Sequence, residues 1–158
     1  MNKIKSIKNI SKIISNNKKA YYDYAIIDQV EAGIVLTGHE VKSLRFVSVS
    51  IQNAYANIIK NEVYILDFNV SRYNQTKFSS NLIKREKKLL LNKKEIEKMT
   101  HLIKRKGYTL IPLMLYFNDR NIVKILLGVA KGKKKYDKRE LIKTRELQRN
   151  SNLTKNLL

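Results

Sequence analysis

The sequence contains no cysteine, and this absence excludes several kinds of site at once. Without thiols the chain can form no disulfide framework, no thiolate zinc site and no cysteine nucleophile, and a reducing compartment fits this composition. Two histidines, His39 and His101, remain as soft metal ligands, and nothing in the sequence brings them together. We therefore expect no metal site and interpret both imidazoles as solvated or partly packed side chains.

Acidic residues, glycines and long apolar runs are scarce as well. The 13 Asp and Glu residues mostly alternate with lysine, so paired carboxylates for nuclease chemistry have little support outside Glu31 and Glu40. The five glycines form no Gly-rich phosphate loop, and we expect no cofactor such as ATP or NAD. No run approaches the roughly 20 apolar residues of a membrane-spanning helix, and lysines interrupt the apolar runs near the first residue. These features predict a soluble, cytoplasmic protein without a membrane partner.

Positive charge is what the sequence has in excess. Its 158 residues include 33 Lys and Arg, which gives a formal net charge of +20, and 43% hydrophobic residues are enough for one compact domain. The basic residues gather in an N-terminal arm through Lys18 and Lys19, in a loop ending at Lys88 and in a tail from Lys131. Nucleic acid is therefore the first partner to expect, and nearby tyrosines that could stack on unpaired bases favour RNA or a single strand.

The first half of the chain predicts strands and one short helix. Residues 21–36 are rich in Tyr, Ile and Val and predict a long strand, with a bend or bulge at residues 31–33. Thr37 and Glu40 have the spacing of a capping box, which predicts that a short helix begins there. Residues 51–59 and 63–68 then predict two strands joined by a tight turn, and hence a hairpin.

The second half predicts a loop, a helix and a second hairpin. Residues 69–88 lose the hydrophobic pattern and accumulate lysine and arginine, which indicates a mobile basic loop with outward-facing charge. Asn92 as N-cap, Glu95 three residues later and Gly107 as the stop bound a helix. Residues 108–117 and 122–130 predict a hairpin in which Pro112, the only proline, requires an edge strand or a bulge.

Together these elements predict a mainly β fold: a small curled antiparallel sheet with short helices. Such sheets usually close, and by analogy with other basic nucleic-acid-binding domains we expect an OB-like barrel. The expected organisation is a basic extension over residues 1–16, the barrel over residues 17–130 and a basic tail over residues 131–158. The tail has too few apolar residues to bury itself, so we expect it to be disordered when free and helical once phosphates neutralise it.

Six segments of the sequence resemble, in order, the SsrA-binding protein family, which is also called small protein B. The resemblance extends from residue 17 to about residue 149, and EVKSLR, together with AKGKK followed by DKR, is its most specific part. The segments are NKKA (17–20), DY (23–24), EAGIVLTGHEVKSLR (31–45), KKLLLNKKEI (87–96), GYTLIPLMLYF (107–117) and GVAKGKKKYDKR (128–139).

The resemblance implies a monomeric RNA-binding factor rather than an enzyme. Its OB-like barrel would bind the tRNA-like domain of transfer-messenger RNA and deliver it to stalled ribosomes for trans-translation. The carboxylate of Glu31 would accept hydrogen bonds from base N–H groups. The expected RNA-binding residues are Asn17, Lys18, Lys19, Glu31, Lys88 and Leu90. The expected tail residues for the small-subunit rRNA, in the decoding centre and mRNA channel, are Lys131, Lys133, Lys134, Tyr136, Asp137, Lys138 and Arg139.

The sequence departs from the family pattern at two pairs of positions, and two other functions are alternatives to this interpretation. Tyr21 and Tyr22 replace the Arg-His pair usual in the family, and Leu82 and Ile83 stand where an acidic residue and a proline are usual. A basic ribosomal or ribosome-assembly protein that binds rRNA has a similar composition. An RNase is the enzymatic alternative, and it would require clustered acids or histidines.

Overall fold

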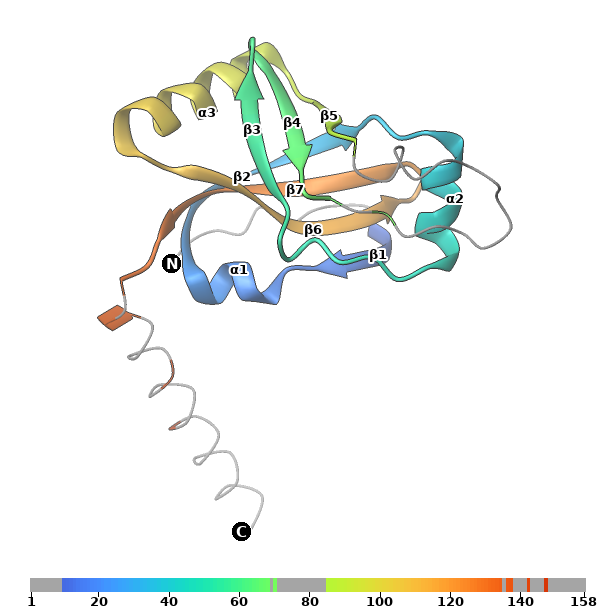
Figure 1. Ribbon diagram of the computed structural model, residues 1–158, viewed down its shortest axis with the longest axis horizontal. Helices are drawn as coiled ribbons and strands as arrows, with labels where there is room; N and C mark the ends of the chain where they lie inside the picture. Colours follow the sequence, from blue (N-terminus) through green and yellow to red (C-terminus); the bar gives the residue numbers. More distant parts are fainter. Residues whose placement is uncertain are drawn as a thin grey trace.

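The structure is a computed structural model, and it describes residues 10–68, 70, 85–134, 136, 137, 142 and 147. Within these residues the main body consists of seven strands and three helices, which Figure 1 shows along the chain. The helices are α1 (Lys18–Asp23), α2 (Gly38–Phe46) and α3 (Lys93–Lys106). The strands are β1 (Ile10–Asn16), β2 (Tyr24–Ile34), β3 (Tyr55–Ile59), β4 (Glu62–Leu66), β5 (Lys87–Leu90), β6 (Thr109–Asn118) and β7 (Val123–Gly132).

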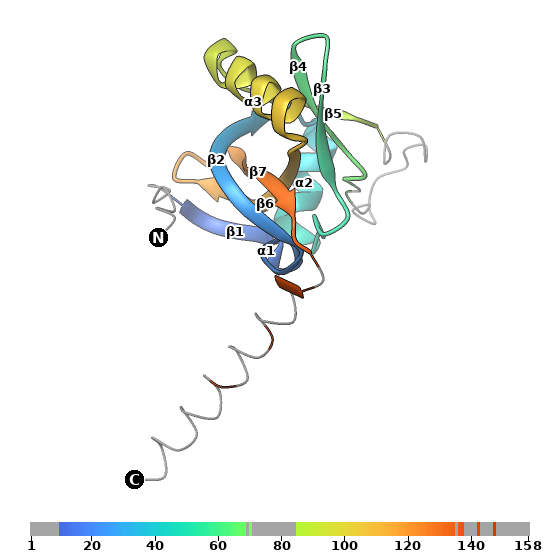
Figure 2. The same ribbon diagram turned by 90° about the vertical axis from the view of Figure 1, so that its left-hand side faces the viewer.

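All seven strands belong to one antiparallel sheet, in the order β1-β6-β3-β4-β5-β2-β7. Strand β7 also pairs with β6, so the six strands from β6 to β7 in this order pair in a circle. Strand β1 pairs with β6 and lies outside this circle. Figure 2 shows the resulting curl, in which β2, β7 and β6 lie across from β3, β4 and β5. The predicted class, a mainly β antiparallel fold with short helices, is confirmed.

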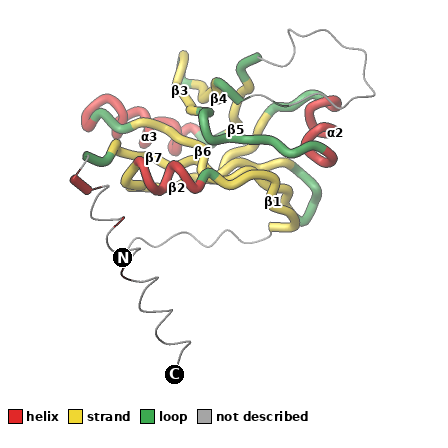
Figure 3. Tube along the Cα trace, turned by 60° about the horizontal axis from the view of Figure 1, so that its bottom comes forward, coloured by secondary structure: helices red, strands yellow, loops and turns green. Residues whose placement is uncertain are grey.

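The main core fills the inside of this curl. Because side chains alternate along a strand, every second residue points inward, and Val63, Ile65, Ile125 and Leu127 are fully buried there. Helices α2 and α3 lie at opposite ends of the sheet (Figures 1 and 3), and α3 adds the buried Met99 to the core. Burial of this apolar surface, at roughly 25 cal/mol per Å², is the main stabilising contribution to the fold.

A second, smaller apolar cluster lies on the opposite face of β6 and β7, beneath α1. Ala20 of α1 packs there with Ile111, Leu113 and Leu126. Gly128 is required for this packing, since a Cβ atom at that position would lie 2.9 Å from the Leu113 Cδ1 atom. The cluster therefore fixes α1 on the outer surface of the sheet.

The two predicted capped helices are confirmed. In α2 the Thr37 hydroxyl accepts a hydrogen bond from the Glu40 amide, while the Glu40 carboxylate accepts one from the Thr37 amide. In α3 the Glu95 carboxylate accepts a hydrogen bond from the Asn92 amide at 3.0 Å. Gly107 ends α3 with φ of 60°, a left-handed conformation that glycine adopts without a steric penalty.

Both predicted hairpins are confirmed, although the first strand, β3, begins at Tyr55 and not at residue 51. Lys60 and Asn61 form the turn between β3 and β4, with φ of 49° and 61°, and positive φ at both central positions is characteristic of a two-residue type I′ turn. Strands β6 and β7 form the second hairpin. Their register shifts between Pro112 and Met114, and β6 has neighbours on both sides, so the proline sits at a bulge and not on an edge strand.

The prediction of one strand over residues 21–36 is wrong about where the strand begins and about where it is irregular. Residues 21–23 belong to α1, which Asn17 caps, and the strand begins only at Tyr24. The irregularity in β2 lies between Ile26 and Asp28 instead of at residues 31–33. Strand β1, which adds to β6, was not predicted, because its short apolar stretches are interrupted by lysine and asparagine.

The expected outward-facing charge of residues 69–88 is wrong at one position. Lys87 opens β5 and is completely buried, while its neighbour Lys88 is half-buried on the other face. A strand places successive residues on opposite faces, so two adjacent lysines cannot share one environment. Residues 71–84, with the basic and family-divergent positions expected there, lie outside the described residues.

Candidate nucleic-acid interface

The outer face of β2, β5, β6 and β7 brings together residues that are far apart in the sequence. Lys124 of β7 pairs with Tyr116 of β6 on one side and with Gly33 of β2 on the other. Gly33 in turn pairs with Leu90 of β5. Partners directly opposite each other in antiparallel strands point to the same face, and Glu31, two residues before Gly33, shares it. We call these five residues the outer face.

Glu31 is held at the surface by a buried tyrosine. The Tyr116 hydroxyl donates a hydrogen bond of 2.5 Å to Glu31 Oε2, and Tyr116 is only 1% exposed. The Lys124 ammonium lies 3.8 Å from Glu31 Oε1, and the Glu31 side chain is 43% exposed. Burial, reinforced by the Glu31 carboxylate, raises the pKa of Tyr116. The phenol therefore remains a donor at physiological pH and fixes the orientation of an accessible carboxylate.

Leu90 presents an apolar surface beside this carboxylate. Leu90 is 53% exposed and so offers an apolar contact at the surface. A Cβ atom at Gly33 would lie 3.2 Å from the Leu90 Cβ atom, so the glycine lets Leu90 lie over β2. The outer face thus combines an oriented acceptor, an ammonium group and an apolar contact.

Lys88, which was also expected to bind RNA, is paired within the protein. Its ammonium group forms an ion pair with Glu62, whose other carboxylate oxygen accepts a 2.6 Å hydrogen bond from the Tyr64 hydroxyl. The Lys88 hydrogen bond lowers the pKa of Glu62 and the same pair raises the pKa of Lys88. Lys88 therefore stays charged, but Glu62 balances its charge locally.

Asn17, which was expected to bind RNA, is buried in the structure. It is 1% exposed, and its side-chain oxygen accepts a hydrogen bond from the Ala20 amide at 3.0 Å. Its amide nitrogen donates to the carbonyl oxygens of Pro112 and Ile51, at 3.0 and 3.3 Å. Every polar group of this side chain is thus used inside the protein, whereas the two lysines that follow it are exposed.

The first residues of the expected tail dock onto α1 and β2. Lys131 belongs to β7 and pairs with β2. The Lys133 amide donates to the Asp23 carbonyl at 2.9 Å, and its ammonium donates to the Tyr21 carbonyl at 2.8 Å. Further along, the Asp137 carboxylate accepts from the Lys134 amide, and Tyr136 is 69% exposed. Lys138 and Arg139 lie outside the described residues.

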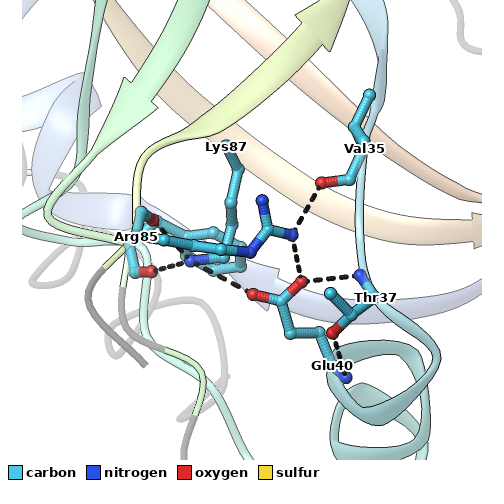
Figure 4. A network of polar contacts seen from close by, with 6 residues as sticks. Val35, Thr37, Glu40, Arg85 and Lys87 are labelled. Atoms are coloured by element: carbon cyan, nitrogen blue, oxygen red, sulfur yellow. Dashed lines mark hydrogen bonds and ion pairs between the residues drawn. The ribbon is translucent and has the colours of Figure 1, made fainter. Parts of the chain in front are cut away.

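A buried ionic cluster joins α2 to β5 behind the outer face (Figure 4). Glu40 Oε2 accepts from the Thr37 amide at 2.8 Å and from Arg85 at 2.5 Å. Its other oxygen faces the Lys87 ammonium at 3.5 Å. Burial alone would raise the pKa of Glu40, but the Thr37 amide, Arg85 and Lys87 together lower it. The carboxylate therefore stays charged inside the protein.

Lys87 is the cation of this cluster and has no exposed surface. Its ammonium donates to the carbonyl oxygens of Phe68 and Arg85, at 2.9 and 3.0 Å, and lies 5.2 Å from the centre of the Phe68 ring. Burial lowers the pKa of Lys87, and the nearby Glu40 opposes that shift. The cluster fixes the start of β5, the strand that carries Leu90.

The carboxylates that an RNase would need are not assembled. Glu31 lies on the outer face with Tyr116, whereas Glu40 lies in the ionic cluster with Arg85 and Lys87. Among the residues that the structure describes, no three His, Asp or Glu side chains gather in a way that could hold a metal ion. The described helices also include none that is long and apolar enough to cross a membrane.

The sequence analysis missed Tyr116 and Lys124. Lys124 is the single charged residue in an otherwise apolar stretch, and alternation along that stretch would have placed it opposite the core-facing residues. No such signal was available for Tyr116, whose burial and bond to Glu31 depend on the pairing of three strands.

Comparison with known proteins agrees with the fold. The profile of the SmpB protein family matches residues 14–156. An SsrA-binding protein of Thermosipho melanesiensis is 46% identical over 138 residues, covering 87% of this chain and 94% of that protein. One of Treponema denticola is 47% identical, covering 87% and 89%. A solved structure described as "tmRNA-SmpB: a journey to the center of the bacterial ribosome" matches with a TM-score of 0.63 and 37% identity, over 80% of this chain and 92% of that one. The chain belongs to the SmpB protein family.

Proposed function

We propose that this protein binds the tRNA-like domain of transfer-messenger RNA and delivers it to stalled ribosomes for trans-translation. Relatives named SsrA-binding protein and a related tmRNA-SmpB structure in the bacterial ribosome support this function. The excess of 33 Lys and Arg over 13 Asp and Glu supplies the attraction to phosphate that RNA binding needs. We expect a cytoplasmic monomer without enzymatic activity.

The observation that carries this proposal is the fixed, exposed carboxylate of Glu31. In a protein with a net charge of +20, an acid held in place on an RNA-binding face has a specific use. It can accept hydrogen bonds from base N–H groups, which a lysine cannot do. Leu90 beside it offers apolar contact, and Lys124 offers a phosphate or base partner.

We assign the other expected residues to supporting roles. Asn17 acts by holding α1, so that Lys18 and Lys19 stand exposed next to the RNA. Lys88 adds positive charge beside Leu90 while it remains paired with Glu62. We further infer that the curled sheet is an OB-like barrel, an interpretation that the circular order of strand pairing supports.

The tail is proposed to act on the ribosome. Its basic residues would contact rRNA phosphates in the decoding centre and mRNA channel, Tyr136 would stack on a base, and the segment beyond would become helical there. The start of the tail is anchored by Lys133 on α1, so a truncation that tests the tail should follow Lys134 and leave that anchor intact.

The experiment is a binding titration with a labelled transcript of the tRNA-like domain, followed by fluorescence anisotropy. Glu31→Gln should weaken binding about 10- to 100-fold, because a hydrogen bond to a charged group contributes about 1.5–3 kcal/mol. Leu90→Ala should also weaken it, while Ile122→Ala, a control of matched exposure (52% against 53%), should not. Wild-type protein that binds unrelated RNA equally well would refute the proposal and favour a general rRNA-binding protein.

The same preparation tests the tail. Truncation after Lys134 should leave the affinity for the tRNA-like domain within about twofold, because the outer face and the Lys133 anchor remain. The truncated protein should fail to support tagging of stalled chains in a reconstituted translation system. Tagging at the wild-type rate would contradict the role of the tail.

A further inference from the structure

A cleft of about 390 Å³ lies between α1 and the start of β3, away from the outer face. Small and apolar residues, including Ala54 and Ile111, form part of its lining, and Tyr24 and Tyr55 belong to it as well. Its volume falls in the lower range of pockets that hold small organic groups. None of the functions proposed above uses this cleft.

The position of the cleft links the two proposed RNA-binding regions. Lys19 and Asp23 of α1 line one side of it. Tyr24, also in the lining, pairs with Gly132 at the end of β7, where the tail begins. The Lys133 amide bonds to the carbonyl of Asp23 at the same place. RNA held by α1 and RNA that meets the tail would therefore both pass close to the cleft.

The side chains around the cleft are those that recognise an unpaired base. The Tyr55 side chain is exposed on β3 (43%), which leaves its ring available for stacking. Gln52 and Asn53 are exposed, and each carboxamide offers two donors and an acceptor for the edge of a base. Thr109 adds a hydroxyl, and the Lys19 ammonium can neutralise a phosphate. Stacking and edge recognition together are how proteins read single-stranded RNA.

Another cleft in the described part of the chain differs in chemistry, although it is larger. It measures about 590 Å³ and runs along α3, where Lys93, His101 and Lys104 are exposed. The aromatic group in its lining is the imidazole of His101, which is smaller than the two tyrosines in the lining of the first cleft. It therefore offers a smaller stacking surface than the cleft between α1 and β3, which is the better match to a base.

We propose that the cleft between α1 and β3 accepts one unpaired nucleotide base of RNA. The base stacks on Tyr55, Gln52 and Asn53 read its edge, and its phosphate lies near Lys19. This inference rests on the proposed RNA-binding function. The base can come from transfer-messenger RNA or from small-subunit rRNA, since the recognition chemistry is the same.

The test compares Tyr55→Ala with Tyr55→Phe, which keeps the ring, and with Ile59→Ala, a control on the same strand with 39% exposure. Each is titrated with the labelled tRNA-like domain and with isolated small ribosomal subunits. Tyr55→Ala should lose about 5- to 150-fold in affinity for one of the two, because stacking of a base on an aromatic ring has that magnitude. Tyr55→Phe and Ile59→Ala should stay within about twofold of wild type. The RNA whose binding weakens identifies the source of the base.

Chemical probing of the bound RNA adds a second readout. A base that the wild-type protein protects should become reactive when the protein carries Asn53→Ala or Gln52→Ala. Both residues lie in an exposed turn, so these two variants serve as the test if Tyr55→Ala does not fold. If the wild type binds both RNAs and all cleft variants bind and protect them equally, the inference is overturned while the proposed function stands. If the wild type binds neither RNA, the proposed function itself fails.

Discussion

Replacing Glu40 by Gln should destabilise the protein through the lysine that it leaves behind. The substitution keeps the size of the side chain and its ability to accept from Thr37 and Arg85. It removes the negative charge 3.5 Å from the Lys87 ammonium, which has no exposed surface. The cluster would then hold an unpaired, fully buried cation, which is one of the most costly arrangements in a protein interior.

Two estimates limit the size of this effect. At 3.5 Å and an effective dielectric constant near 20, the lost attraction is about 5 kcal/mol. Lys87 can also escape by losing its proton, which at pH 7 costs about 5 kcal/mol for a lysine with an ordinary pKa of 10.5. The retained hydrogen bonds and the carbonyl partners of Lys87 offset part of this loss, so we expect Glu40→Gln to lower the free energy of unfolding by about 2–4 kcal/mol.

The pH dependence separates this mechanism from a simple packing defect. Burial lowers the pKa of Lys87 in the folded protein, and loss of Glu40 lowers it further. Between that lowered value and 10.5 the unfolded chain binds more protons than the folded one, so stability rises with pH in this window. The cost of Glu40→Gln should therefore shrink between pH 7 and pH 9.5.

The assay is urea unfolding followed by far-UV circular dichroism, since the chain has no tryptophan. Wild type, Glu40→Gln, Lys87→Met and the double variant are compared at both pH values. The double variant should be more stable than Glu40→Gln, because its remaining unpaired cation, Arg85, is 28% exposed, whereas Lys87 is fully buried. A cost for Glu40→Gln below about 1 kcal/mol, or one that does not change with pH, would refute this account of the cluster.

Three further predictions concern single side chains. Asn17→Ala removes the cap of α1 and the two hydrogen bonds that the Asn17 side chain donates to the carbonyl groups of Ile51 and Pro112. Urea unfolding should therefore show a loss of about 2–4 kcal/mol, and a loss below about 1 kcal/mol would contradict its structural role. Gly128→Ala places a Cβ atom 2.9 Å from the Leu113 Cδ1 atom, which should reduce the free energy of unfolding by about 1–3 kcal/mol and lower the thermal midpoint. An unchanged midpoint would show that β6 can move to make room. Tyr116→Phe frees the Glu31 carboxylate and should weaken binding of the tRNA-like domain several-fold in the anisotropy titration, and unchanged affinity would mean that Glu31 needs no such support.

Local signals made much of the fold predictable from the sequence. The helix boundaries followed from Thr37 with Glu40 and from Gly107, because capping and positive φ depend on residues within one turn. The hairpin turn at Lys60 and Asn61 followed from its position between two apolar strands. In contrast, α1 was mistaken for strand because its tyrosines favour strands, and the cap that overrides this preference has partners far along the chain.

The candidate site was predictable only in part, since it depends on strand register. Glu31 and Leu90 were chosen through a family resemblance, and the pairing of Gly33 with Leu90 places them on one face. No local pattern showed that Tyr116 reaches Glu31, because the contact spans three strands. The burial of Lys87 was equally hidden, since its partner Glu40 lies on a distant helix.

The central claim, that this chain is a carrier of transfer-messenger RNA, is tested most directly by the RNA that it holds in its own cells. The tagged protein would be captured from those cells, washed at high and at low salt, and the bound RNA sequenced. We predict that transfer-messenger RNA is the most enriched species and that rRNA is released by high salt. Retention of rRNA after the high-salt wash, without enrichment of transfer-messenger RNA, would contradict the claim.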